Sequence, residues 1–182
     1  MTEFTKHDVE TAPENSRPII EGVKKGLGFV PNLLGYMAES PELLKGYTTL
    51  SGIFDKTSLN AVERQVVLLT VSRLNTCHYC MAAHTSIAQM QKVPADVIRS
   101  LRDDAAIEDG KLEALQTFTK AMVEARGYVQ QDGIDAFLEA GYTKQNVLEV
   151  VLGVGVKTLS NYTNHFVETE VDEAFSANAW QG

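Results

Sequence analysis

The sequence predicts an all-α protein with a single domain. Apolar residues recur at helical spacing along most of the chain, and residues typical of helix starts precede several of these stretches. One valine-rich run could be a buried strand, but it would have no partner strand elsewhere in the chain. The 182 residues are 44% hydrophobic, which is enough for one core. We expect residues 1–17 to form a flexible N-terminal arm and residues 18–182 to form the domain.

Helix-start signals mark the first half of the predicted domain. Pro31 and the pair Ser40-Pro41 each place a proline in a first helical turn, where its missing N–H does no harm. Asn60 and Glu63 have the spacing of a capping box. Asn75-Thr76 indicates a break between two helices. We expect helices over residues 31–37, 41–54, 60–74, 77–91 and 94–103.

Glycines end two of the helices predicted for the second half, over residues 108–126 and 133–140. Gly127 follows the first and Gly141 follows the second, before Thr143 caps a long apolar helix that continues to about residue 162. This last segment is the valine-rich run, for which we prefer a helix. We interpret its Gly153 and Gly155 as close-packing positions, because no strand precedes them as a nucleotide-binding motif requires.

A faint repeat at an offset of 83 residues suggests an internal duplication. It aligns Val67, Leu69 and Val71 with valine and leucine positions of the last helix, and it aligns Cys77-His78-Tyr79-Cys80 with Ser160-Asn161-Tyr162-Thr163. Hydroxyl groups would stand where the thiols are. Apolar helices match one another easily, so the duplication is a hypothesis.

Charge and hydropathy disfavour two classes of partner. With 16 basic and 24 acidic residues the net charge is -8, and the acidic residues are scattered, which disfavours nucleic acid. The N-terminus has no signal-peptide pattern, and the apolar runs are shorter than the roughly 20 residues of a membrane span. We expect a soluble, cytoplasmic protein.

The two cysteines, Cys77 and Cys80, carry the clearest chemical signal. A disulfide over so short a loop stabilises a fold little, so such a pair is more typical of catalysis or metal binding. A helix start favours the thiolate, and helical spacing puts His84 on the same stripe, within reach of Cys80. A thiolate that attacks peroxide becomes a sulfenic acid, which a second cysteine converts to a disulfide. From the residues alone Cys77, nearer the helix terminus, would be the more exposed and more activated thiol. A zinc site with His78 or His165 as fourth ligand, and inert core cysteines, are the alternatives.

The stretch from Glu63 to His84, with its Cys-x-Tyr-Cys-x-x-x-His core, resembles the alkylhydroperoxidase D-like and carboxymuconolactone decarboxylase superfamily. The segment Asn161-Tyr162-x-Asn164-His165 is similar to that of its longer, peroxidase-related members. The resemblance implies an all-helical fold in a homo-oligomer, a trimer or hexamer. It also implies that Cys80 attacks peroxide, that Cys77 resolves the intermediate and that His84 relays protons, without a cofactor. A thioredoxin-like or lipoyl-type dithiol would regenerate the pair.

Two positions depart from the superfamily pattern. Gln65 stands twelve residues before the first cysteine, where the family usually has a glutamate of the proton relay, and an amide cannot hold a proton. Tyr79 stands where some members have histidine. We expect Tyr79, Tyr162 and His165 to line the substrate site. The alternatives to a peroxidase are a lactone decarboxylase of the other branch and a non-catalytic, redox-sensing oligomer, which Gln65 favours.

Overall fold

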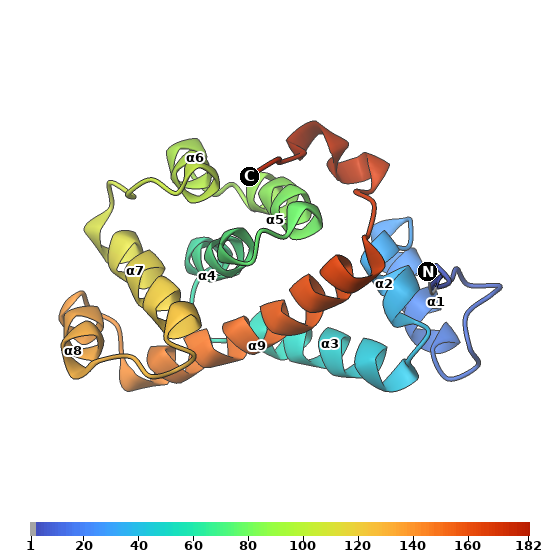
Figure 1. Ribbon diagram of the computed structural model, residues 1–182, viewed down its shortest axis with the longest axis horizontal. Helices are drawn as coiled ribbons and strands as arrows, with labels where there is room; N and C mark the ends of the chain where they lie inside the picture. The colour runs from blue at the N-terminus through green and yellow to red at the C-terminus, as the bar shows by residue number, and fades with distance from the viewer. Residues whose placement is uncertain (1–2) are drawn as a thin grey trace.

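Helices form all the regular structure in residues 3–182, the part of the chain that the computed structural model describes. The prediction of an all-α fold is therefore confirmed. The helices are α1 (Arg17–Leu27), α2 (Asn32–Met37), α3 (Pro41–Phe54), α4 (Ala61–Leu74), α5 (His78–Met90), α6 (Ala95–Asp103), α7 (Gly110–Glu124), α8 (Gln131–Glu139), α9 (Lys144–Val167) and the 3-10 helix η1 (Glu173–Asn178). Figure 1 shows α9 crossing the molecule alongside α3, and it contacts α4 and α5 as well.

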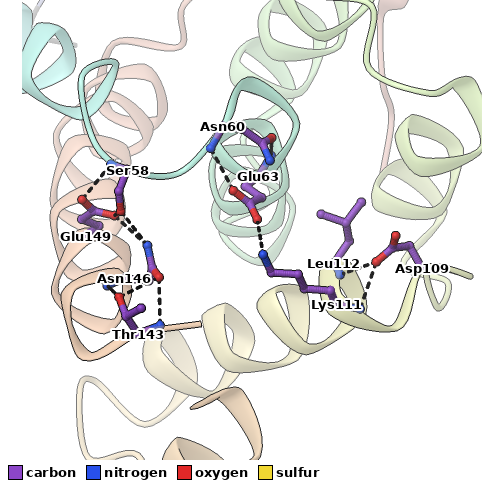
Figure 2. Close-up of polar contacts among 9 residues, drawn as sticks. All are labelled: Ser58, Asn60, Glu63, Asp109, Lys111, Leu112, Thr143, Asn146 and Glu149. Atoms are coloured by element: carbon purple, nitrogen blue, oxygen red, sulfur yellow. Dashed lines mark hydrogen bonds and ion pairs between the residues drawn. The ribbon is translucent and has the colours of Figure 1, made fainter. Parts of the chain in front are cut away.

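The predicted helix-start signals at Asn60 and Thr143 are both present as capping boxes. Asn60 Oδ1 accepts the Glu63 N–H at 3.0 Å, and Glu63 Oε2 accepts the Asn60 N–H at 2.8 Å (Figure 2). Thr143 and Asn146 form the second box at the start of α9. These local bonds satisfy N–H groups that have no partner within their helices.

Two clusters of buried apolar side chains form the core. The larger one joins α4 to α6, α7, α8 and α9, and the smaller one joins α1, α2 and the start of α5, including both cysteines. Tyr47 of α3 packs against both clusters. The cysteines therefore lie in the protein interior, with α3 and α9 close by.

The valine-rich run is helical, as predicted, and it packs closely against α3 and α4. A Cβ atom on Gly153 would come within 2.8 Å of Val67 Cγ1 and 2.9 Å of the Phe54 ring, so this position accepts no larger side chain without a shift. The same interpretation was wrong for Gly155, where a Cβ would meet no atom within 4 Å. α9 also continues unbroken through residues 158–160, which the proposed repeat aligns with the break between α4 and α5.

Two helices were not anticipated, α1 and η1. Pro18 occupies the first turn of α1, where proline starts a helix as readily as it ends one. The N-terminal segment, predicted to be flexible, makes contacts with α2: the His7 N–H donates to Gly35 O at 3.1 Å, and Ser16 Oγ donates to Ala38 O at 2.7 Å.

The described helices of this protein differ from membrane-spanning helices in length or in hydropathy. No helix between residues 3 and 182 combines the length and the apolar character needed to cross a membrane.

Candidate active site

The two sulfur atoms lie side by side at the start of α5. Cys77 is the N-cap residue of this helix and Cys80 lies in its first turn; both are free thiols, 1% and 2% exposed. The Asn164 side chain of α9 reaches both, with Nδ2 3.6 Å from Cys77 Sγ and 3.2 Å from Cys80 Sγ. One amide group thus contacts both thiols.

Polar side chains on one face of α9 cover the cysteines. Lys157, Ser160 and Asn164 repeat at helical spacing and all three are buried. Ser160 Oγ lies 3.8 Å from Cys80 Sγ. Lys157 is 0% exposed, and its Nζ has no hydrogen-bond partner among the described residues. We call these three residues, with Asn161 between them, the α9 polar face.

The surroundings favour the ionised form of Cys80. Burial opposes ionisation of this thiol, but a hydrogen bond from Cys77, the positive charge of Lys157 and the Ser160 hydroxyl outweigh it, and the pKa of Cys80 lies well below that of an ordinary cysteine. The same hydrogen bond to Cys80, together with burial and the charge of Cys80, raises the pKa of Cys77. These directions favour Cys80 as the more activated thiol, as the resemblance implies, and not Cys77, as helix position alone suggested.

His84 and Gln65 contact each other, as the resemblance implies for the relay positions. His84 Nδ1 lies 3.2 Å from Gln65 Oε1, and Gln65 Nε2 donates to Gln91 Oε1 at 3.1 Å. Since the Gln65 oxygen faces the ring, His84 donates from Nδ1, and its Nε2 carries no proton in the neutral form. Burial and the charge of Lys157 lower the pKa of His84 well below its usual value, so the ring is neutral at pH 7. Within residues 3–182 the ring makes no hydrogen bond to Cys80.

Two residues beside Cys80 were missed by the sequence analysis, Lys157 and Tyr47. Burial and the charge of Cys80 raise the pKa of Tyr47, so this phenol keeps its proton. A signal for Lys157 was present, because it is the one Lys, Arg, Asp or Glu in the α9 segment that follows Glu149. A lone lysine in such a helix, three and seven residues before Ser160 and Asn164, is typical of a buried polar face.

A pocket of about 530 Å³ opens beside Cys77, and we call it the Cys77 pocket. Three of the residues predicted to be catalytic or to line the substrate site lie in its wall: Cys77, Tyr79 and His165. The other lining residues are Asn75, Thr76, His78, Asn164, Glu168 and Thr169. Tyr162, also expected there, lies outside it and lines two smaller hollows on other faces of α9.

The Tyr79 side chain is held in place by a hydrogen bond to the C-terminal segment. Its hydroxyl donates to Asp172 Oδ2 at 2.6 Å, and Asp172 also accepts the Asn32 N–H that begins α2. Burial and the neighbouring Asp172 raise the pKa of Tyr79. Tyr79 therefore fastens the start of α5 to the C-terminal segment.

The alternative of a zinc site at the cysteines can be compared with the arrangement of possible ligands. Among the residues that the structure describes, no three His, Cys, Asp or Glu side chains come together as a metal site would require.

The comparisons with known proteins agree with the fold and with the cysteine motif. Residues 41–121 match the carboxymuconolactone decarboxylase family, and this segment contains the Cys77-Cys80 motif, Gln65 and His84. This match supports the resemblance predicted from the motif, over the segment that carries the motif. No curated protein matches the sequence.

Solved structures share the fold over nearly the whole chain. A peroxidase-related protein from Ralstonia eutropha JMP134, described as an alkylhydroperoxidase AhpD core, is 20% identical with a TM-score of 0.82, over 96% of each chain. A peroxidase-related protein from Silicibacter sp. TM1040 is 19% identical with a TM-score of 0.80, over 96% of this chain and 95% of that one. A cysteine-to-alanine variant of the debrominase Bmp8, in complex with 2,3,4-tribromopyrrole, is 18% identical with a TM-score of 0.81, over 98% and 96%.

Proposed function

We propose that this protein is a thiol-dependent peroxidase that reduces hydrogen peroxide or organic hydroperoxides with Cys80 and Cys77. The observation that supports this best is the pair of free thiols at the start of α5 that share one contact, Asn164 Nδ2, at 3.6 Å from Cys77 Sγ and 3.2 Å from Cys80 Sγ. The pKa of Cys80 is shifted downward and that of Cys77 upward. A thiolate is the form that attacks an O–O bond, and a neighbouring thiol is needed to resolve the product.

The reaction has two steps at the sulfur atoms. The Cys80 thiolate attacks one peroxide oxygen, the O–O bond breaks, and the departing oxygen leaves as water or an alcohol once it has gained a proton. Cys80 is then a sulfenic acid. Cys77 attacks the Cys80 sulfur, a disulfide forms and water leaves, so that two thiols are oxidised for each peroxide reduced.

A second dithiol must return the disulfide to two thiols. We propose a thioredoxin-like or lipoyl-type reductant, since exchange with a dithiol balances the electrons. Cys77 lines the pocket, whereas Cys80 does not, so the reductant would attack Cys77 and release the Cys80 thiolate, the better leaving group. We further propose a cytoplasmic homo-oligomer, a trimer or hexamer.

The direct test is stopped-flow oxidation with excess hydrogen peroxide and with an organic hydroperoxide. The free-thiol count should fall from two to zero, with a Cys77–Cys80 disulfide in the peptide map. An unchanged thiol count with both peroxides would refute the proposal.

Thiol-dependent debromination is a second candidate. The Cys77 pocket, at about 530 Å³, is far larger than hydrogen peroxide needs and falls in the usual range for small organic ligands. A debrominase shares the fold. The two thiols could replace one carbon–bromine bond by carbon–hydrogen, releasing bromide and forming the disulfide. Bromide release from 2,3,4-tribromopyrrole in the presence of a dithiol, absent in the Cys80→Ser variant, would support it.

Lactone decarboxylation, the activity that names the matched family, makes the opposite prediction. That chemistry needs proton transfer and no thiol, so a Cys77→Ser, Cys80→Ser double variant would keep its activity on a carboxymuconolactone. Loss of peroxide reduction in the same variant separates the two activities.

A further inference from the structure

We propose that Lys157, buried beside Cys80 on the α9 polar face, donates the proton that the departing peroxide oxygen needs. The inference rests on the proposed peroxidase reaction and identifies its acid. In the superfamily pattern that proton belongs to a glutamate–histidine relay, for which this chain has the Gln65–His84 pair.

The burial and the hydrogen bonding of Lys157 are those expected of a side chain that takes part in the reaction. The side chain is 0% exposed, and its Nζ has no hydrogen-bond partner in the described part of the chain. A buried ammonium without partners is costly, so such residues persist where a charge on a neighbour or a reaction requires them. Its charge acts on both thiols, and Ser160, one turn along α9, lies 3.8 Å from Cys80 Sγ.

The other titratable groups around Cys80 are poor proton donors. On α5, the Cys77 thiol keeps its proton and His84 is neutral, with its remaining N–H directed to Gln65. On α3, burial makes the Tyr47 phenol a weaker acid than usual. Asn164 and Ser160 on α9 donate hydrogen bonds but carry no acidic proton. Lys157 is the remaining group, and as an ammonium it carries a transferable proton.

The proton balance closes over the catalytic cycle. In the reduced protein Cys80 is a thiolate beside the Lys157 ammonium. When the O–O bond breaks, the Cys80 sulfur gains one oxygen, the other takes a proton from Lys157 and leaves as water or an alcohol, and Lys157 becomes a neutral amine. Disulfide formation then removes the Cys77 proton and the sulfenic oxygen as water. Reduction by a dithiol releases the Cys80 thiolate and one proton, which returns to Lys157.

The test compares two reactions of Cys80 in a Cys77→Ser background. Alkylation by iodoacetamide requires the thiolate but no proton donor, because iodide leaves unprotonated. Oxidation by cumene hydroperoxide requires both. At a pH where Cys80 is fully ionised in each variant, Lys157→Met should leave alkylation within about threefold and should slow oxidation about 100-fold, the usual loss for a general acid. Lys157→Gln, which retains a hydrogen-bond donor without an acidic proton, should slow oxidation as much.

Controls separate this role from the alternatives. Lys144→Met removes a lysine from the exposed start of α9 and should change neither rate. Peracetic acid, whose leaving carboxylate needs little protonation, should lose less than about tenfold in Lys157→Met. Equal slowing of alkylation and oxidation, or a loss of the oxidation rate in His84→Asn instead of Lys157→Met, would overturn the assignment. If the parent chain is alkylated but never oxidised, the proposed peroxidase function fails rather than the role of Lys157.

Discussion

Each half of α9 buries one charged side chain, and the two side chains differ in their hydrogen bonds. Near its start, Glu149 is buried but accepts four hydrogen bonds, from the Ser58 N–H at 2.8 Å, Ser58 Oγ at 2.7 Å, Gln145 at 2.8 Å and Asn146 at 3.0 Å. Figure 2 shows this carboxylate with Ser58 and Asn146 around it. Farther along, Lys157 is also buried, yet the structure gives its Nζ no hydrogen-bond partner within residues 3–182.

This difference in hydrogen bonding predicts that Glu149 contributes to stability and that Lys157 contributes to the reaction. Burial raises the pKa of Glu149, but its four hydrogen bonds outweigh that effect and lower it, so this charge is fully compensated and ties α9 to the chain before α4. In the part of the chain that the structure describes, the charge next to Lys157 is the thiolate of Cys80, and that charge disappears when the sulfur is oxidised. We therefore expect substitutions at Glu149 to change stability alone, and substitutions around Lys157 to change chemistry.

The largest effect should come from the two sulfur atoms. Cys80→Ser should reduce peroxide consumption by about 10³-fold or more, because it removes the nucleophile. Cys77→Ser should leave the first oxidation step and stop the second, so that a sulfenic acid accumulates and reacts with dimedone. Mass spectrometry of the dimedone adduct measures this. The reverse pattern, an adduct on Cys77 in Cys80→Ser, would exchange the two roles.

Removing the Glu149 carboxylate should lower the free energy of unfolding and leave the reaction at Cys80 unchanged. Glu149→Leu leaves the Ser58 N–H and the Asn146 amide without their acceptor, and the free energy of unfolding should fall by about 3 kcal/mol. Urea denaturation followed by circular dichroism measures the loss, with the exposed Glu139→Leu as control.

The same substitution should alter the acid response of the fold. Because the folded-state pKa of Glu149 is lowered, its contribution is present above the unfolded pKa and is lost as the pH falls through the folded one. The difference between wild type and Glu149→Leu should therefore shrink in acid. A slower alkylation of Cys80 in this variant would contradict the separation of the two halves.

The effects of substituting Cys80 and Lys157 on the free energy of unfolding should not be additive, because the two side chains interact. Cys80→Ala leaves the Lys157 ammonium buried without its counter-charge and should destabilise the fold by about 3 kcal/mol. Adding Lys157→Met should restore most of that loss, since a buried methionine needs no partner. Thermal and urea denaturation of the four proteins in this cycle measure the coupling. Additive effects would show that the two side chains do not interact.

The smallest effect should come from Gln65→Glu. A carboxylate at this position would accept the His84 N–H and favour the protonated ring, which adds a second proton donor. Peroxide consumption should rise by less than about tenfold. No gain at all, together with a thiol count that peroxide leaves unchanged, would favour a non-catalytic, redox-sensing role.

Local patterns allowed much of the fold to be predicted. The capping boxes at Asn60 and Thr143, and the glycines after α7 and α8, act within a few residues, so the sequence displays them directly. Helix α1 was not anticipated, although Pro18 lies in its first turn, where proline is favoured. Which glycine of α9 packs closely could not be predicted, because it depends on Val67 and Phe54, which lie far away in the sequence.

The candidate site was predictable in its motif and not in its electrostatics. Spacing placed Cys77, Cys80 and His84 on one stripe, and the position of Gln65 followed from the resemblance. Helix position alone favoured Cys77, whereas the hydrogen bond between the two thiols and the charge of Lys157, on a helix some 80 residues later in the chain, favour ionisation of Cys80. Such contacts depend on the packing of α5 against α9, which no local pattern reveals.

The pH dependence of Cys80 alkylation in the Cys77→Ser variant tests the central claim, that Cys80 is held as a thiolate. Serine keeps a hydroxyl that can donate to Cys80. Because the pKa of Cys80 is lowered, the thiolate should dominate at neutral pH, and the iodoacetamide rate should be the same at neutral and alkaline pH and fall only in acid. A rate that climbs tenfold per pH unit until it levels off above about pH 8.5, as for an ordinary cysteine, would contradict the account.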